Sequence, residues 1–310
     1  MKADKLRRHY KKKSSNYKDW EQRPHAEKHM LFPNNISDQI SIDEVALSKG
    51  ELYTIVSSQN GFLKRKTIIA TIKGTKSQEI IEVLEKIPLE ARKSVKEVTL
   101  DMAKNMESAV KMTFPEAKLV VDRFHVVRLV IDALQHVRIK LRWEELDKEN
   151  QAIQKAKDEG TKYLQKLYKN GDSPKQLLAR SRFILAKKEA TWTENQKERA
   201  GILFDVYPEL KKLYKHTLEF RNIYEAKNKE EAESLLDRWV TKNKELGIKE
   251  FNSVQRTIYY NFEKILNFFE NRSTNAFAES FNAKIKLFRA NQRGVKNTSF
   301  FMFRLATLFA

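Results

Sequence analysis

The sequence lacks cysteine altogether, which excludes disulfide bonds and every zinc site that depends on thiolate ligands. It also lacks any apolar run that approaches the ~20 residues of a membrane-spanning helix. Its first residues, MKADKLRRHYKKK, contain none of the apolar core that a secretory signal needs. These absences predict a cytoplasmic protein without a membrane segment.

Acidic residues are the minority among the charged side chains. The 310 residues include 41 Asp and Glu against 60 Lys and Arg, which gives a formal net charge of +19 and a pI of about 9.7. A protein this basic attracts polyanions, because each phosphate that it neutralises releases counterions. No amphipathic helix with a dedicated basic face favours an anionic membrane instead. The charge therefore predicts a nucleic acid partner and a place at the nucleoid.

Four regions differ in their residue patterns. Residues 1–36 are polar and basic and are predicted to form a solvated arm. Residues 37–125 alternate β-rich runs with amphipathic runs, which predicts a mixed α/β domain. Residues 126–272 are dense in Lys and Glu, hold few Gly or Pro, and predict an all-helical insertion. Residues 273–310 predict two further helices, the first of which carries Glu279.

The second region has a specific element order. Predicted strands lie at 39–43, 51–57, 67–72, 95–100 and 118–121, and predicted helices lie at 77–87 and 102–114. This β-β-β-α-β-α-β order is that of the ribonuclease-H-like fold, in which the first and fourth strands are neighbours. The first predicted strand ends at Asp43, the fourth at Asp101 and the fifth at Asp122. The pattern therefore predicts carboxylates gathered at one edge of a sheet.

The last region has a charge pattern that is unusual for a solvated helix face. No acidic residue follows Glu279, whereas six basic residues do: Lys284, Lys286, Arg289, Arg293, Lys296 and Arg304. This arrangement is natural if the carboxylate binds metal and the cations behind it bind phosphate. Glu279 is therefore the candidate for a third acidic ligand.

At these residues the sequence resembles the DDE transposases of the ISL-three family of bacterial insertion sequences. The resemblance rests on SIDEVALSKGELYTIV, LDMAKNM, FPEAKLVVDRFHVVRLVIDALQHVR and STNAFAESFNAKIKLFRANQRGVKNTSFFMFR, and runs from about residue 36 to 305. It implies a metal-dependent polynucleotidyl transferase that cleaves transposon ends and joins them to target DNA. Members of the family often carry an N-terminal zinc-binding segment and a helix-turn-helix, which the cysteine-free start does not match. A separate polypeptide is expected to recognise the terminal repeats.

Strand cleavage and transfer need an activated oxygen nucleophile and a stabilised leaving oxygen, which two Mg²⁺ or Mn²⁺ ions held by carboxylates provide. The predicted triad is Asp43, Asp101 and Glu279, with Asp122 as the alternative third ligand. The ribonuclease-H-like order favours Asp43, because it requires an acid on the first strand. Asp122 would otherwise cap the following helix.

Further residues are candidates for contacts with DNA near the site. His125 is predicted either to orient phosphate or to be a satisfied core histidine. The basic helix predicts backbone contacts, with an ordinary exposed helix face as the alternative. The candidate set is Arg123, His125, Asn282, Lys284, Lys286, Arg289 and Arg293.

Two other functions remain open at this point. A catalytically inactive DNA-binding remnant of a transposase would share the fold and the charge. A helical RNA-binding protein would explain the charge, but not the acids at the strand ends. Pairing of two DNA ends predicts a homo-oligomer on DNA.

Overall fold

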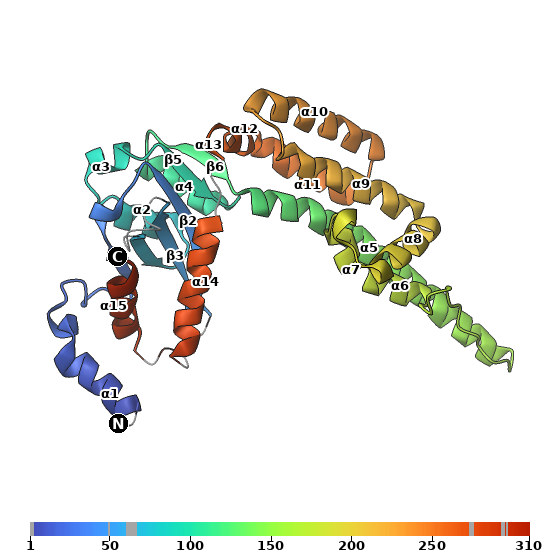
Figure 1. Ribbon diagram of the computed structural model, residues 1–310, viewed down its shortest axis with the longest axis horizontal. Helices are drawn as coiled ribbons and strands as arrows, with labels where there is room; N and C mark the ends of the chain where they lie inside the picture. The colour runs from blue at the N-terminus through green and yellow to red at the C-terminus, as the bar shows by residue number, and fades with distance from the viewer. Residues whose placement is uncertain (1–2, 49, 60–66, 273–275, 293–294, 296) are drawn as a thin grey trace. The chain divides into compact units, whose positions relative to one another are not determined.

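The computed structural model describes residues 3–48, 50–59, 67–272, 276–292, 295 and 297–310. The chain divides into two compact units (Figure 1). The first combines Met1–Arg123 with Glu263–Ala310, and the second is the intervening Phe124–Phe262. Each unit has its own buried apolar residues, and the first carries the sheet.

The first unit is built on a six-stranded sheet with the order β1-β4-β3-β2-β5-β6. Strands β1 to β4 pair in antiparallel fashion, whereas β5 and β6 run parallel to β2. The described strands are β1 (His29–Leu31), β2 (Gln39–Ser48), β3 (Glu51–Ser58), β4 (Ile68–Lys73), β5 (Glu97–Leu100) and β6 (Lys118–Val121). The expected mixed α/β class is confirmed, and β2 and β5 are neighbours as predicted.

Two features of the sheet differ from the sequence prediction. Strand β2 does not end at Asp43 but continues to Ser48, because Glu44, Val45 and Ala46 stay paired with β3. The expected arm contributes edge strand β1, which pairs with β4 and places Met30 in the core at 0% exposure. A three-residue strand is too short to show an alternating pattern in the sequence.

Helices cover both faces of this sheet. On one face α2 (Ser77–Leu84) and α4 (Lys104–Thr113) pack against β2 and β5, with Ile80 and Val110 beside Ile42 and Val98. On the other face lie α14 (Ala276–Asn291) and α15 (Thr298–Phe309), drawn in orange and red in Figure 1. The short helices α3 (Leu89–Lys93) and α13 (Phe268–Asn271) complete this part of the unit.

The N-terminal segment is anchored to the first unit rather than only solvated. It contains α1 (Ala3–His9), the π-helical η1 (Tyr10–Ser14) and the 3-10 turns η2 (Asn16–Asp19) and η3 (Pro33–Asn35). Tyr17 is buried against Phe300 and Phe303 of α15, and its hydroxyl donates to Ser299 Oγ at 3.0 Å. The anchor is aromatic, and the cationic groups of Lys11 and Arg23 lie over the Tyr17 ring, 5.3 Å and 5.1 Å from its centroid.

The second unit, Phe124–Phe262, is described without gaps; its regular elements are all helices, and residues 159–173 form a long connection between α5 and α6. Its long helix α5 begins at the unit boundary, and α12 (Phe262–Leu266) leads back into the first unit. Gly160 and Gly171 lie in the connection between α5 and α6, and Gly247 caps α10 with φ of 63°. The remaining elements are α5 (Arg123–Asp158), α6 (Pro174–Arg180), α7 (Arg182–Ala186), η5 (Glu189–Thr191), α8 (Glu194–Val206), α9 (Pro208–Ile223), α10 (Lys229–Leu246) and α11 (Lys249–Tyr260).

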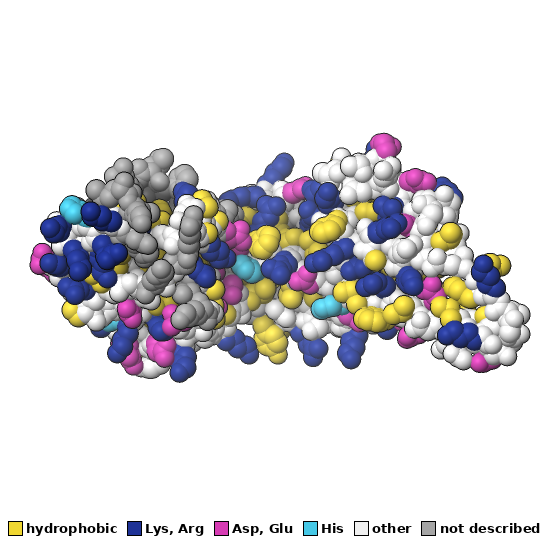
Figure 2. Space-filling model, turned by 90° about the horizontal axis from the view of Figure 1, so that it is seen from below, with side chains coloured by type: hydrophobic (Ala, Val, Ile, Leu, Met, Phe, Trp, Pro, Cys, Tyr) yellow, Lys and Arg dark blue, Asp and Glu magenta, His cyan; other side chains and the backbone are white. Residues whose placement is uncertain are grey.

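The surface carries the excess of positive charge. Figure 2 shows many Lys and Arg side chains and fewer Asp and Glu side chains on the face that it presents. Among the described residues, no helix is both long enough and apolar enough to cross a membrane.

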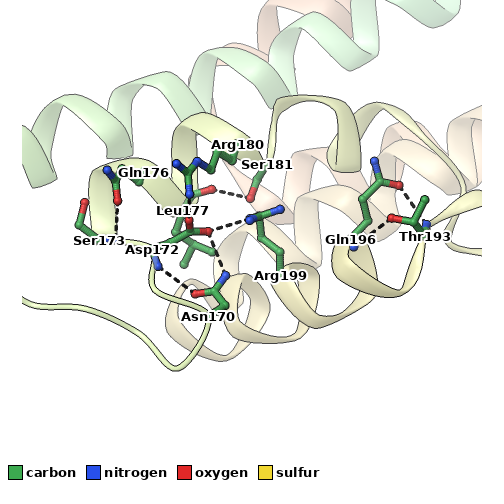
Figure 3. A network of polar contacts seen from close by, with 10 residues as sticks. All are labelled: Asn170, Asp172, Ser173, Gln176, Leu177, Arg180, Ser181, Thr193, Gln196 and Arg199. Carbon is green, nitrogen blue, oxygen red and sulfur yellow. Dashed lines mark hydrogen bonds and ion pairs between the residues drawn. The ribbon is translucent and has the colours of Figure 1, made fainter.

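A buried aspartate organises the loop that leads into α6. Asp172 is 0% exposed and accepts hydrogen bonds from Arg199 Nε at 2.7 Å, from Asn170 Nδ2 at 2.9 Å and from Arg180 (Figure 3). Burial alone would raise the pKa of Asp172, but the hydrogen bonds from Arg199 and Arg180 lower it below its ordinary value. The next residue, Ser173, opens α6 with a capping box.

A second polar residue, His216, is buried between α9, α10 and α11. Its ring stacks on Trp239 with centroids 4.5 Å apart, and its Nε2 lies 3.1 Å from Asn243 Oδ1. Burial lowers the pKa of His216, because the charged ring would lose its hydration. The folded state therefore binds fewer protons at this site than the unfolded state.

We expect this histidine to make the second unit sensitive to mild acid. Its folded pKa lies below the unfolded value, so its contribution is fully present above about pH 6.5 and is lost as the pH falls through the folded pKa. Urea unfolding at pH 7.5 and pH 5 should show a smaller loss of stability for His216→Gln than for the wild type. Equal losses in the two proteins would contradict the assignment.

Candidate active site

The sheet register aligns three aspartates in one row. Ser41 of β2 pairs with Thr99 of β5, and Leu100 of β5 pairs with Val121 of β6. Continuing these parallel registers brings Asp43, Asp101 and Asp122 level with one another. The pairing of β5 with β6 does extend to Asp122, because the backbone N–H of Asp122 donates to Leu100 O at 2.9 Å.

Residues level with each other on parallel strands point to the same face, and neighbouring strands are ~4.8 Å apart. Asp43 and Asp101 thus lie on adjacent strands, and Asp122 lies one strand further away. Asp43 is inside β2 and beyond the end of its pairing with β5, while Asp101 and Asp122 directly follow β5 and β6. Asp101 and Asp122 thus follow strand ends as predicted, whereas Asp43 lies inside a strand.

Helix α14 lies over this row and contacts it directly. Phe281 and Ile285 anchor the helix on the sheet beside Val45 of β2. Asn282 is 5% exposed, and its Nδ2 donates to Asp43 Oδ2 at 2.5 Å. Glu279 lies one turn before Asn282, in the first turn of the helix, and is partly buried. Side chains three residues apart share a helix face, so α14 carries Glu279 to the same face of the sheet as Asp43.

Backbone donors fix the two strand aspartates further. Asp43 Oδ1 accepts from the N–H of Glu44 at 2.7 Å. Asp101 Oδ1 accepts from the N–H of Ala103 at 2.8 Å, which shapes the turn into α4. Both carboxylates are therefore held in defined orientations before any ligand binds.

Glu44 directly follows Asp43 in β2 and is a further acidic neighbour of the site. Glu44 pairs with Thr54 of β3. Its side chain points to the face opposite that of Asp43, because side chains alternate along a strand. Burial raises the pKa of Glu44, and the negative charges of Asp101 and Asp43 raise it further. In the sequence, the two adjacent acidic residues Asp43 and Glu44 are the feature that could have indicated this neighbour of the site. The edge of the sheet thus concentrates negative charge from three carboxylates.

The described residues contain no group of three His, Asp or Glu side chains that is already close enough to hold a metal ion. The chemistry of the donors nevertheless fits a hard divalent cation, which prefers carboxylate oxygens. Asp43 and Asp101 would supply these oxygens from adjacent strands, and a cation bound there would offset the negative charge that acts on Glu44.

The basic candidates have separate positions in the structure. Lys284 and Lys286 are exposed on α14. Arg289 is half-buried, and its guanidinium donates to Ala46 O at 3.2 Å, which ties α14 to β2. Arg293 lies outside the described residues.

The candidates near the unit boundary lie at the start of α5. Asp122 precedes this helix and is 2% exposed. Arg123, the last residue of this part of the first unit, is exposed. His125 belongs to the second unit, is half-buried, and meets the Phe124 ring edge-on with centroids 5.7 Å apart.

Comparison with known proteins gives two matches. Residues 40–305 match the family model of the ISL3-type DDE transposases, whose description is "Transposase". The chain is also 22% identical over 278 residues to the transposase for insertion sequence element IS1001 of Bordetella parapertussis. This alignment covers 88% of the chain but 61% of the relative, so the chain spans about three fifths of that protein's length.

Proposed function

Because this chain belongs to the ISL3 family of DDE transposases, we propose that it cleaves DNA at the ends of an insertion sequence and joins those ends to target DNA. Asp43, Asp101 and Glu279 are the proposed catalytic carboxylates. The observation that carries this proposal is the alignment of Asp43 with Asp101 beneath the helix that bears Glu279. The match to the family model includes all three residues.

We interpret β2 to β6 with α2 and α4 as a ribonuclease-H-like core. The strand order β4-β3-β2-β5-β6 and the parallel pairing of β5 and β6 with β2 support this interpretation. The helical unit Phe124–Phe262 then interrupts the core between β6 and α14. Such an interruption accounts for the long sequence separation between Asp101 and Glu279.

The three carboxylates would hold two divalent cations, Mg²⁺ or Mn²⁺. When bound, these ions activate the attacking oxygen and stabilise the leaving oxygen of the phosphodiester. Water is the attacking group in cleavage, and a 3′-hydroxyl is the attacking group in joining. Because bare carboxylates repel one another, we expect the set to close only when cations are present.

The residues of the chain supply orientation and charge in this reaction. The bonds from Asn282 and Glu44 fix Asp43, and the bond from Ala103 fixes Asp101. Rigid placement of this kind lowers the barrier by removing the entropy cost of alignment. Exposed Lys284 and Lys286 are the proposed phosphate contacts, and we keep Arg123, His125 and Arg293 as further DNA-contact candidates. Pairing of two DNA ends calls for a second copy of the chain.

The test is cleavage of DNA that carries the ends of the element, in the presence of Mg²⁺ or Mn²⁺. Metal supplies several kcal/mol of transition-state stabilisation, and each 1.36 kcal/mol is tenfold in rate. We therefore expect Asp101→Asn and Glu279→Gln to lower nicking by more than ~10³-fold, while salt-sensitive DNA binding persists. If the wild type binds DNA but never cleaves it, the chain is an inactive DNA-binding remnant.

A further inference from the structure

Asn282 is a buried polar residue of α14. Its neighbours Phe281 and Ile285 belong to the core beneath α14, and its own side chain is 5% exposed. A buried amide must find hydrogen-bond partners, because it has given up those of water. The partner of its Nδ2 is Asp43 Oδ2, at 2.5 Å and across 239 residues of sequence.

This bond completes the support of the Asp43 carboxylate. One oxygen accepts from the backbone N–H of Glu44 at 2.7 Å, and the other accepts from Asn282. A carboxylate has about four acceptor sites, so two hydrogen bonds that orient it are compatible with its binding a cation as well.

The same helix face carries a proposed metal ligand. Asn282 follows Glu279 by three residues, which places both on one side of α14. The bond to Asp43 therefore also fixes the rotation of α14 about its axis, and with it the direction of Glu279. A neutral amide does this without adding charge beside Asp43 and Asp101, which the sheet register brings level on adjacent strands.

We propose that Asn282 is a positioning residue that aligns Asp43 with Glu279 for metal binding, and not a contact to the DNA backbone as its sequence context suggests. The inference rests on the proposed function, because it presumes that the two carboxylates bind metal. The buried side chain of Asn282 offers little surface to a phosphate, whereas Lys284 and Lys286 on the same helix are exposed.

The experiment is calorimetric titration of the full chain with Mn²⁺, alongside Mn²⁺-dependent cleavage. Asn282→Leu keeps the size of the side chain and removes the donor. Loss of a group that orients a metal ligand typically weakens metal affinity by about 10- to 100-fold, and we expect a rise in the Mn²⁺ Kd of this size. The Mn²⁺ midpoint of cleavage should rise with it, while DNA affinity stays unchanged.

The matched control is Asn291→Leu, which makes the same substitution at an exposed position at the end of α14. Its Kd for Mn²⁺ should equal that of the wild type. A merely structural role for Asn282 would lower the number of binding sites per chain and leave their Kd unchanged, so stoichiometry and affinity separate the two roles.

A second variant keeps the test decisive if Asn282→Leu does not fold. Asn282→Ser keeps a polar group in the helix, but its hydroxyl is too short to reach Asp43, so the same weakening of Mn²⁺ binding is expected. A folded Asn282 variant that binds Mn²⁺ as the wild type does, in a protein that cleaves DNA, would overturn the positioning role alone. A wild type that neither binds Mn²⁺ nor cleaves would overturn the proposed function, and the positioning role with it.

Discussion

Replacing Asp43 with Asn should abolish DNA cleavage, whereas the same change at Asp122 should be tolerated. Both aspartates stand in the row that the sheet register creates, and Asn282 of α14 donates a hydrogen bond to Asp43, at the β2 end of that row. The removal of a carboxylate that holds a catalytic cation forfeits several kcal/mol, which corresponds to more than ~10³-fold in rate. For Asp122→Asn we expect less than about a tenfold loss, or about 1.4 kcal/mol, because Asp122 holds no catalytic cation in the proposed triad.

The comparison uses cleavage rates of the two variants at saturating Mn²⁺ on the same DNA ends. The two substitutions are chemically identical, so Asp122→Asn is the matched control for Asp43→Asn. Thermal melting of both proteins checks that each is folded, because Asp122 is buried at 2% exposure. The reverse ranking, with Asp122→Asn inactive and Asp43→Asn active, would replace Asp43 by Asp122 in the triad.

Replacing Asp172 with Ala should destabilise the second unit by about 3 kcal/mol, the lower end of the cost of breaking a buried ion pair. The side chain of Asp172 is fully buried, and its loss leaves the guanidinium of Arg199, which is 22% exposed, without its carboxylate. Arg180 is 55% exposed and regains water, so it adds little to the cost. The loop held by Asn170 also loses its anchor.

Urea unfolding at pH 7 measures this effect. Glu225→Ala is the control, because it removes a carboxylate from an exposed pair with Lys188 in the same unit and should cost less than about 1 kcal/mol. Because folding lowers the pKa of Asp172, the stability that this residue contributes depends on pH. The contribution is present above the pKa of Asp172 in the unfolded state and is lost as the pH falls through its pKa in the folded state. Equal unfolding midpoints for the two variants would show that the buried network contributes nothing.

Local residue patterns were enough to predict most of the elements. Thr67–Ile72 and Val95–Leu100 are β-rich runs, and the structure has strands at Ile68–Lys73 and Glu97–Leu100. The acids that follow β5 and β6 were visible for the same reason, since Asp101 and Asp122 directly end apolar runs. Strand β1 was missed, because its pairing with β4 and not its own pattern makes it a strand.

The sequence by itself determined the mixed α/β class, the helical middle of the chain, the basic charge and the family resemblance, because these depend on composition, short-range periodicity and motifs. Only the tertiary structure decided that Asp43 lies inside a strand and level with Asp101, since register is set by the pairing of β2 with both neighbours. Only packing decided that Asn282 turns inward to Asp43, because the choice between a phosphate and a buried carboxylate depends on how α14 lies against a sheet far away in sequence.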